Sequence, residues 1–205
     1  MNLAARIFAR TAVVALVAIS AAFFAGCGKM NDAGDKREAG DKKEAADNGK
    51  EDLRKGLEAV KEKKLDEAFK YFEKAANNGN TDAMICLAFC DYEGKSVADK
   101  AKAKELIKKA ADAGNVKAKF YVLYFDANVD RKMKKEEAFE EMKKLDAELL
   151  KLAEANDPLA QVTYIEFCKL RVEMEESPEA KAKATEDLEK WMRKAEETGA
   201  DKIFD

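Results

Sequence analysis

Cysteine is the residue type in this chain with the greatest potential for redox or metal chemistry. Cys86 and Cys90 are four residues apart, which places them on one face of a helix, and Cys168 lies far along the chain. Two cysteines at that spacing within one continuous helix do not readily reach disulfide geometry. We therefore predict that these three thiols fill small positions of a hydrophobic core, with a redox or metal-binding pair as the alternative.

Catalytic motifs are scarce in the sequence. The chain has no histidine, which excludes a Ser-His-Asp triad, a histidine general base and an HExxH zinc site. The segment Glu93-Gly94-Lys95-Ser96 ends like a phosphate-binding loop, but Phe89 stands where that motif needs its first glycine. Acid pairs such as Glu136-Glu137 lie among lysines, as on a solvated helix face. We predict no catalytic residue, no metal and no cofactor, and hence a protein that is not an enzyme.

The composition favours a helical, heavily charged protein. Of the 205 residues 47% are hydrophobic and 39% are charged, and only two are proline. The formal net charge is -3. Removing residues 1–26, which carry two arginines and no acid, leaves -5. A mildly acidic body with interspersed charges argues against a nucleic-acid partner.

The N-terminal residues have the pattern of an export signal. Arg6 and Arg10 precede an apolar run from Thr11 to Phe24, and small residues follow. The run is short for a helix that spans a membrane. Phe24-Ala25-Gly26-Cys27 resembles a bacterial lipobox, although that pattern prefers leucine at the first place. A plain signal peptide or an uncleaved anchor with a chance cysteine is the alternative.

The lipobox resemblance implies a lipid anchor on Cys27 and removal of the signal peptide 1–26. Two or more acyl chains on that cysteine would hold the protein stably at a membrane. Gly28 follows where enteric bacteria use aspartate to retain lipoproteins at the inner membrane. We therefore expect a protein of the cell envelope, anchored at the outer membrane and facing the periplasm.

A charged tether follows the lipidation site. Residues 28–50 contain six acids, six bases and one large apolar residue, Met30. Such a segment cannot bury enough surface to offset its ordering entropy. We predict a flexible tether over 27–50, with partial helix as the alternative. As a coil it would reach on the order of 25 Å.

The remaining chain repeats itself. Residues 68–80 and 103–115 share alanine, apolar and Gly-Asn positions at an offset of 35. A third copy starts at residue 137, at the same offset, and ends 42 residues after the second, so it contains seven extra residues. A half-copy covers 191–199. The residues that stand where helices need a left-handed stop are Gly79, Gly114, Asn156 and Gly199.

Helix caps agree with these repeats. Asn80 or Thr81 can cap the helix that follows Gly79, and Asp157-Pro158 supplies a cap and a first-turn proline. The apolar run from Phe120 to Phe125 could be a buried strand. Because it aligns with residues 85–90 in the repeat, we predict a helix there.

The segment Tyr71-Phe72-Glu73-Lys74-Ala75-Ala76-Asn77-Asn78-Gly79 resembles the first helix of a Sel-one-like repeat, a relative of the tetratricopeptide repeat. Further matches are Ala83, Leu87, Ala88, Gly94, Val97, Asp99 and Trp191-Met192-Arg193-Lys194-Ala195. The resemblance covers about residues 65–201, strongly in two units and weakly in the third. It implies an all-α fold, a short right-handed α-solenoid of helix-turn-helix repeats over 51–205, with a capping helix at 53–63. The disulfide scheme of cysteine-rich family members is not implied, because a cysteine on each helix of a unit is absent.

The seven extra residues of the third unit are close to two helical turns. We predict that they lengthen its first helix while the apolar stripe keeps its face. A longer helix would overhang its neighbour, and we expect the segment ending in Trp191 to fold back over the overhang and close the stack. The alternative is that the overhang, around Leu149, is a partner site.

Four aromatic residues are candidates for partner-binding anchors, because binding grooves use rigid aromatic side chains. They are Tyr71, Tyr121, Tyr124 and Trp191, each with core packing as its alternative role. Stacked helix pairs form a concave surface that suits protein or peptide partners. The expected function is a lipid-anchored interaction or scaffolding module with an unknown protein or peptide partner. A cell-envelope hydrolase or lactamase-like enzyme and a structural spacer are the alternatives.

Overall fold

The computed structural model describes residues 48–93 and 97–203, and its backbone there is helical throughout, without strands. The elements are α2 (Lys50–Lys61), α3 (Leu65–Asn77), α4 (Thr81–Glu93), α5 (Val97–Asp112), α6 (Val116–Asn128), α7 (Lys135–Lys143), α8 (Asp146–Glu154), α9 (Pro158–Met174), α10 (Pro178–Thr198) and the 3-10 turn η2 (Ala200–Lys202). The predicted all-α class is confirmed. The predicted signal peptide 1–26, the lipidation site Cys27 and nearly all of the tether lie outside the described residues.

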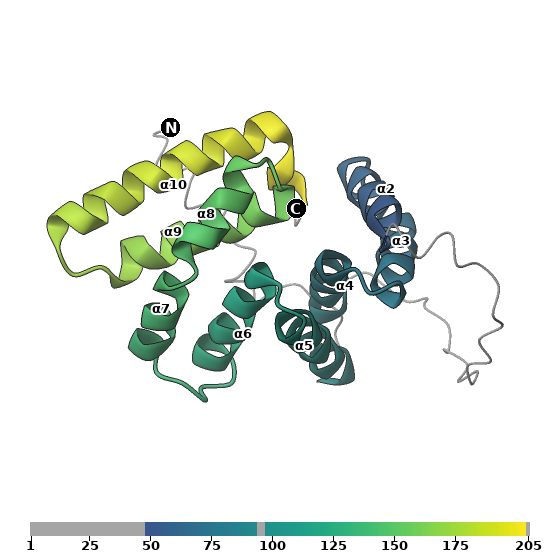
Figure 1. Ribbon diagram of the computed structural model, residues 1–205, viewed down its shortest axis with the longest axis horizontal. Helices are drawn as coiled ribbons and strands as arrows, with labels where there is room; N and C mark the ends of the chain where they lie inside the picture. The colour runs from purple at the N-terminus through teal and green to yellow at the C-terminus, as the bar shows by residue number, and fades with distance from the viewer. Residues whose placement is uncertain (1–47, 94–96, 204–205) are drawn as a thin grey trace, which may run out of the picture.

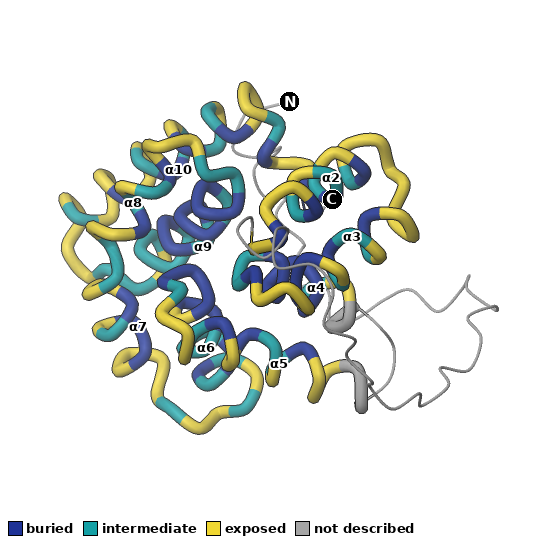
Figure 2. The backbone as a smooth tube through the Cα atoms, turned by 45° about the vertical axis from the view of Figure 1, so that its right-hand side comes forward, coloured by how far each residue is buried: buried dark blue, intermediate teal, exposed yellow. Residues whose placement is uncertain are grey.

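Most helices pack chiefly on their neighbours along the chain, which makes a one-dimensional stack rather than a bundle (Figure 1). The exception is the pair α7 and α8, since α7 packs on α6 and α9 while α8 packs on α9. The stack curves until its ends approach each other. At the end of α2, Lys61 Nζ lies 3.5 Å from the carbonyl oxygen of Thr198, the last residue of α10. Figure 2 shows α2 and the C-terminal end side by side. In the described ranges no helix combines the length and apolar character needed to cross a bilayer.

The predicted stops between helices are confirmed. Gly79, Gly114 and Gly199 have φ angles of 87°, 94° and 72°, and Asn156 has 63°. The residue directly after Gly79, Gly114 and Asn156 caps the next helix. These caps, Asn80, Asn115 and Asp157, accept hydrogen bonds from backbone N–H groups in the first turns of α4, α6 and α9. These stop-and-cap pairs recur at offsets of 35 and 42 residues, so the repeat seen in the sequence is a repeat of structure.

Small residues set the distance between helices. Ala83, Ala118 and Ala160 hold equivalent positions in α4, α6 and α9, and all three are fully buried. Gly56 does the same in α2, because a Cβ there would lie 2.4 Å from the ring of Phe72 on α3. The buried hydrophobic residues belong to one cluster with members on every helix from α2 to α10, and Figure 2 shows the buried stretches along the backbone. The run from Phe120 to Phe125 is part of α6, as predicted.

The third unit departs from the prediction, because its first helix breaks into two. The backbone N–H groups of Lys144 and Leu145 donate to the carbonyls three residues earlier, of Glu141 and Met142, at 3.2 and 2.9 Å. This tight turn ends α7 and redirects the chain into α8. The side-chain hydroxyl of Tyr164 on α9 donates to Asp146 at the start of α8, 3.0 Å away, and ties the new helix to its neighbour.

The break removes the predicted overhang. Met142 on α7 and Leu149 on α8 are both buried, at 2% and 0% exposure, so both segments of the apolar stripe reach the core. The two segments take different neighbours, since α7 packs chiefly on α6 and α8 packs chiefly on α9. The predicted lengthened helix is therefore wrong, and so is the alternative of an exposed partner site at Leu149.

The C-terminal segment does fold back on the stack, although it covers α9 rather than an overhang (Figure 1). Ser177 caps α10 by accepting a hydrogen bond from the N–H of Ala180 at 3.0 Å. Trp191 is 2% exposed and meets Tyr164 of α9 edge to face, with ring centroids 5.4 Å apart. After α10 the described chain forms only η2, so no full fourth unit follows within it.

Candidate functional site

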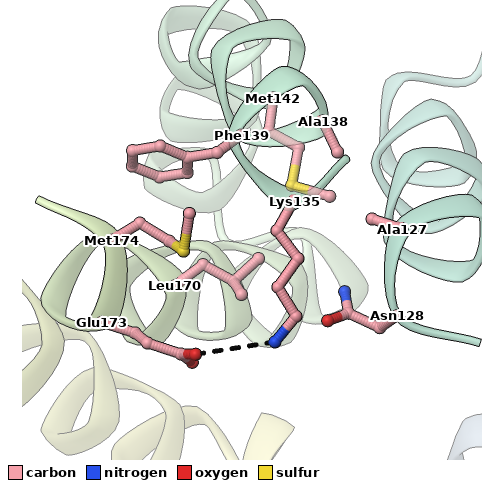
Figure 3. Close-up of a pocket in the computed structure, with 9 residues that line it drawn as sticks. All are labelled: Ala127, Asn128, Lys135, Ala138, Phe139, Met142, Leu170, Glu173 and Met174. Atoms are coloured by element: carbon pink, nitrogen blue, oxygen red, sulfur yellow. Dashed lines mark ion pairs between the residues drawn. The ribbon is translucent and has the colours of Figure 1, made fainter. Parts of the chain in front are cut away.

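A shallow apolar cleft opens between the ends of α6 and α9 and the face of α7. It leaves about 10 Å³ of room inside, which is on the order of one water molecule. Ala127 and Asn128 come from α6, Leu170, Glu173 and Met174 come from α9, and the residues from α7 are Lys135, Ala138, Phe139 and Met142. Figure 3 shows the two methionine side chains, Phe139 and Leu170 around one space. The lining is therefore mostly apolar, with Lys135 and Glu173 as its charged members.

The loop that joins two walls of this cleft is held in place. It runs from residue 129 to 134, and the N–H groups of Lys132 and Met133 donate to the carbonyl of Asp126 at 2.8 and 3.3 Å. The Asp130 carboxylate pairs with Lys104 of α5 and, at 3.1 Å, with Lys132. The hydrogen bond from Lys104 is the main cause that keeps the pKa of Asp130 below its ordinary value. The loop between α6 and α7 is therefore held in place next to the cleft.

The mouth of the cleft is charged. Lys135 Nζ lies 3.8 Å from a carboxylate oxygen of Glu173, and both side chains are more than half exposed (Figure 3). An exposed pair at that distance contributes little to stability. Val129, in the adjoining loop, is 41% exposed, and only Leu65 is a more exposed large hydrophobic residue among those described.

A second polar cluster lies at the N-terminal ends of α4, α6 and α9. The ammonium group of Lys117 is 2.9 Å from Asp82 and 2.5 Å from Asp157, and its side chain is only 4% exposed. Asn115 adds hydrogen bonds to Thr81 and Asp82 at 2.9 and 2.6 Å. Burial lowers the pKa of Lys117, but the two carboxylates outweigh this effect and raise its pKa above the ordinary value. This cluster joins three units and leaves its polar atoms paired.

The cysteines are not arranged for catalysis. Cys86 and Cys168 are buried and free of disulfides, as the core prediction stated, but Cys90 is exposed, so the prediction for that residue is wrong. Burial raises the pKa of the Cys86 thiol well above its ordinary value and that of Cys168 to about 12. Both are therefore protonated at neutral pH and are poor nucleophiles. The residues that the structure describes contain no group of three potential ligands for a metal.

The four predicted aromatic anchors do not meet at one place. Tyr121 is 4% exposed, with its hydroxyl 3.3 Å from Thr163, and Trp191 of α10 is buried against α9, so both are core residues in this fold. Tyr71 and Tyr124 are half-buried. None of the four lines the cleft.

Sequence reasoning missed both the cleft and Lys117. One signal for Lys117 was present: it stands 35 residues after Asp82, at the same place in the next unit, with the opposite charge. No comparable signal marked the cleft, because it depends on where α7 ends.

Comparison of the chain with protein families, with curated proteins and with solved structures finds no match.

Proposed function

We propose that the chain is a lipid-anchored protein of the cell envelope that binds or scaffolds other proteins through stacked Sel-one-like repeats. The observation that carries this proposal is the apolar cleft, set in a curved stack of helices, whose two charged lining residues, Lys135 and Glu173, form an exposed pair with each other. Helical stacks of this kind offer extended surfaces for partners. The lipobox-like segment before Cys27 supports the envelope location.

The cleft fits recognition better than chemistry for a physical reason. Its floor consists of methionine, leucine and phenylalanine side chains, which adapt to apolar groups of different shape. Its charged residues, Lys135 and Glu173, face each other across the mouth and are well solvated. Neither is desolvated in the way that activates a catalytic acid or base.

Site-specific photo-crosslinking in envelope extracts tests the proposal. The folded part from Asn48 onward would carry a photoreactive residue at position 128, which lines the cleft, or at position 67, an exposed site on α3. A module predicts one dominant protein adduct that forms at position 128 and is absent at 67. A spacer predicts no adduct at either position, and that result would overturn the proposal.

A further inference from the structure

The two ends of the stack meet, although the architecture does not require it. In a stack of helix pairs each unit contacts its neighbours, so the first and last helices need not touch. Here the Nζ of Lys61, at the end of α2, lies 3.5 Å from the carbonyl oxygen of Thr198, 137 residues further along the chain. Among the described elements α2 packs extensively only on α3. The end-to-end contact therefore depends on a side chain, and it can open while every unit stays folded.

The acceptor of this contact is held in place by its own neighbours. The hydroxyl of Thr198 donates to Oε1 of Gln161 on α9 at 2.6 Å, and Gln161 is fully buried. Gly199 then turns the chain with a φ of 72°, and Ala200 is buried again. The C-terminal end of α10 is thus fixed to α9, with the carbonyl of Thr198 next to Lys61.

The C-terminal end of α10 has no cation of its own. Its last turn contains no basic residue, although Glu196 and Glu197 lie there. The last carbonyls of a helix lack partners within it, and the negative end of the helix dipole favours a nearby cation. Lys61 supplies that cation from α2. Its stem also lies close, because a Cβ added at Gly199 would be 3.5 Å from both Cε and Nζ of Lys61.

The charges around the contact were counted on both sides. Within four residues of Lys61 there are three bases and two acids, which leaves +1: Lys61, Lys63, Lys64, Glu58 and Glu62. Within four residues of Thr198 there are two bases and three acids, which leaves -1: Lys194, Lys202, Glu196, Glu197 and Asp201. Glu58 and Glu62 already pair with Arg54 and Lys64. The surroundings therefore favour the contact slightly, and the approach of Lys61 to the helix end supplies most of the attraction.

We propose that Lys61 is an electrostatic latch, which holds the two ends of the stack together and can release them without unfolding. An exposed cation at a helix C-terminus changes the ratio of closed to open forms by a factor of about two to five. Opening separates α2 and α3 from α9 and α10 and widens the concave side of the stack. The latch does not depend on the proposed function, and only its consequence for a bound partner rests on that function.

A distance measurement between the two ends tests the latch. Spin labels would be placed at the exposed positions 67 on α3 and 193 on α10 of the chain from Gly28 onward, which retains every described helix. Cys90→Ser removes the exposed thiol, and Cys86 and Cys168 are buried. Double electron–electron resonance should give a short, narrow distance distribution at low salt. A longer population should grow at about 1 M salt, where the Debye length is about 3 Å.

Variants of Lys61 identify the group responsible. Lys61→Gln should lower the ratio of the short to the long population by about two- to fivefold at low salt, and Lys61→Arg should retain most of it. Lys63→Gln is the matched control, because Lys63 lies in the same turn and its side chain forms no ion pair or hydrogen bond with α10 in the described ranges. It should leave the ratio within the error of the measurement.

Three outcomes would overturn the latch. They are an unchanged distribution in Lys61→Gln, equal effects of Lys61→Gln and Lys63→Gln, and a loss of helical circular dichroism in Lys61→Gln, which would make the contact a part of the fold. The distances are measured without a partner. A negative crosslinking result at position 128 therefore leaves the latch standing, and unchanged distances leave the interaction module standing.

Discussion

Within the cluster around Lys117, losing the lysine and losing the two carboxylate charges should destabilise the fold by different amounts. Lys117 is 4% exposed, whereas the side chains of Asp82 and Asp157 are 26% and 24% exposed. If Lys117 is lost, water can reach both carboxylates. If the carboxylates lose their charge, the ammonium group stays buried at three helix N-termini, where the helix dipoles oppose a cation.

We therefore expect the double change Asp82→Asn and Asp157→Asn to cost more than Lys117→Met. Breaking a buried pair and stranding its charge costs about 3–5 kcal/mol, and we expect the double variant to lie in that range. Lys117→Met should cost about 1–3 kcal/mol, since the remaining carboxylates are partly hydrated. Asparagine still caps α9, so the loss of a cap does not enter the comparison.

The triple variant completes the test. With all three charges removed, nothing buried is left unpaired, and the free energy of unfolding should recover most of what the double variant lost. Urea unfolding is followed by fluorescence of Trp191, the one tryptophan, and by far-ultraviolet circular dichroism. Equal costs for the single and double variants, or a triple variant worse than the double, would refute this account.

The same cluster makes a prediction about pH. The folded state raises the pKa of Lys117 above its ordinary 10.5. A raised pKa on a base contributes stability that is present below the unfolded pKa and is lost as pH rises through the folded pKa. The stability difference between wild type and Lys117→Met should therefore hold at neutral pH and shrink only above about pH 10.5.

Three further predictions follow from single positions. Gly49→Ala should cost more stability than Gly114→Ala in urea unfolding. Both residues have positive φ, but a Cβ at Gly49 would lie 2.8 Å from the backbone of Ala75, while one at Gly114 meets nothing within 4 Å. Equal costs would mean that α2 shifts to relieve this contact. In the part from Asn48 onward, a thiol reagent should modify Cys90 rapidly, and it should modify Cys86 and Cys168 only on unfolding. Cys90→Ser should abolish the fast phase of the reaction. A fast phase that persists in that variant would contradict the burial of Cys86 and Cys168. Cys27→Ser in the full chain should abolish incorporation of a fatty-acid probe, and equal labelling would exclude Cys27 as the acceptor.

Local signals predicted much of the fold because they act over a few residues. The positive φ at Gly79 and Gly114 and the caps at Asn80 and Asp157 need only their own turns, and all four are confirmed. The repeat offset then placed α4, α6 and α9 in register. Burial at the end of a helix was not predictable in this way. Cys90 shares a face with Cys86, but it lies in the last turn of α4, and its exposure depends on how far the neighbouring helices extend.

The third unit shows how one misjudged element conceals a site. Seven extra residues preserve the phase of an apolar stripe, and phase alone favours a single long helix. Burial of the whole stripe is worth more than continuity of the helix, since the break costs few backbone hydrogen bonds and still lets Met142 and Leu149 be buried. The break leaves α7 only nine residues long, while α9 has 17 against 13 in α4 and α6. The added last turn of α9, with Glu173 and Met174, therefore forms a wall that the shorter units lack. The unit that departs from the repeat is also the unit that supplies two walls of the cleft, α7 and α9, and departures from a repeat are the first places to search for a binding site in such a stack.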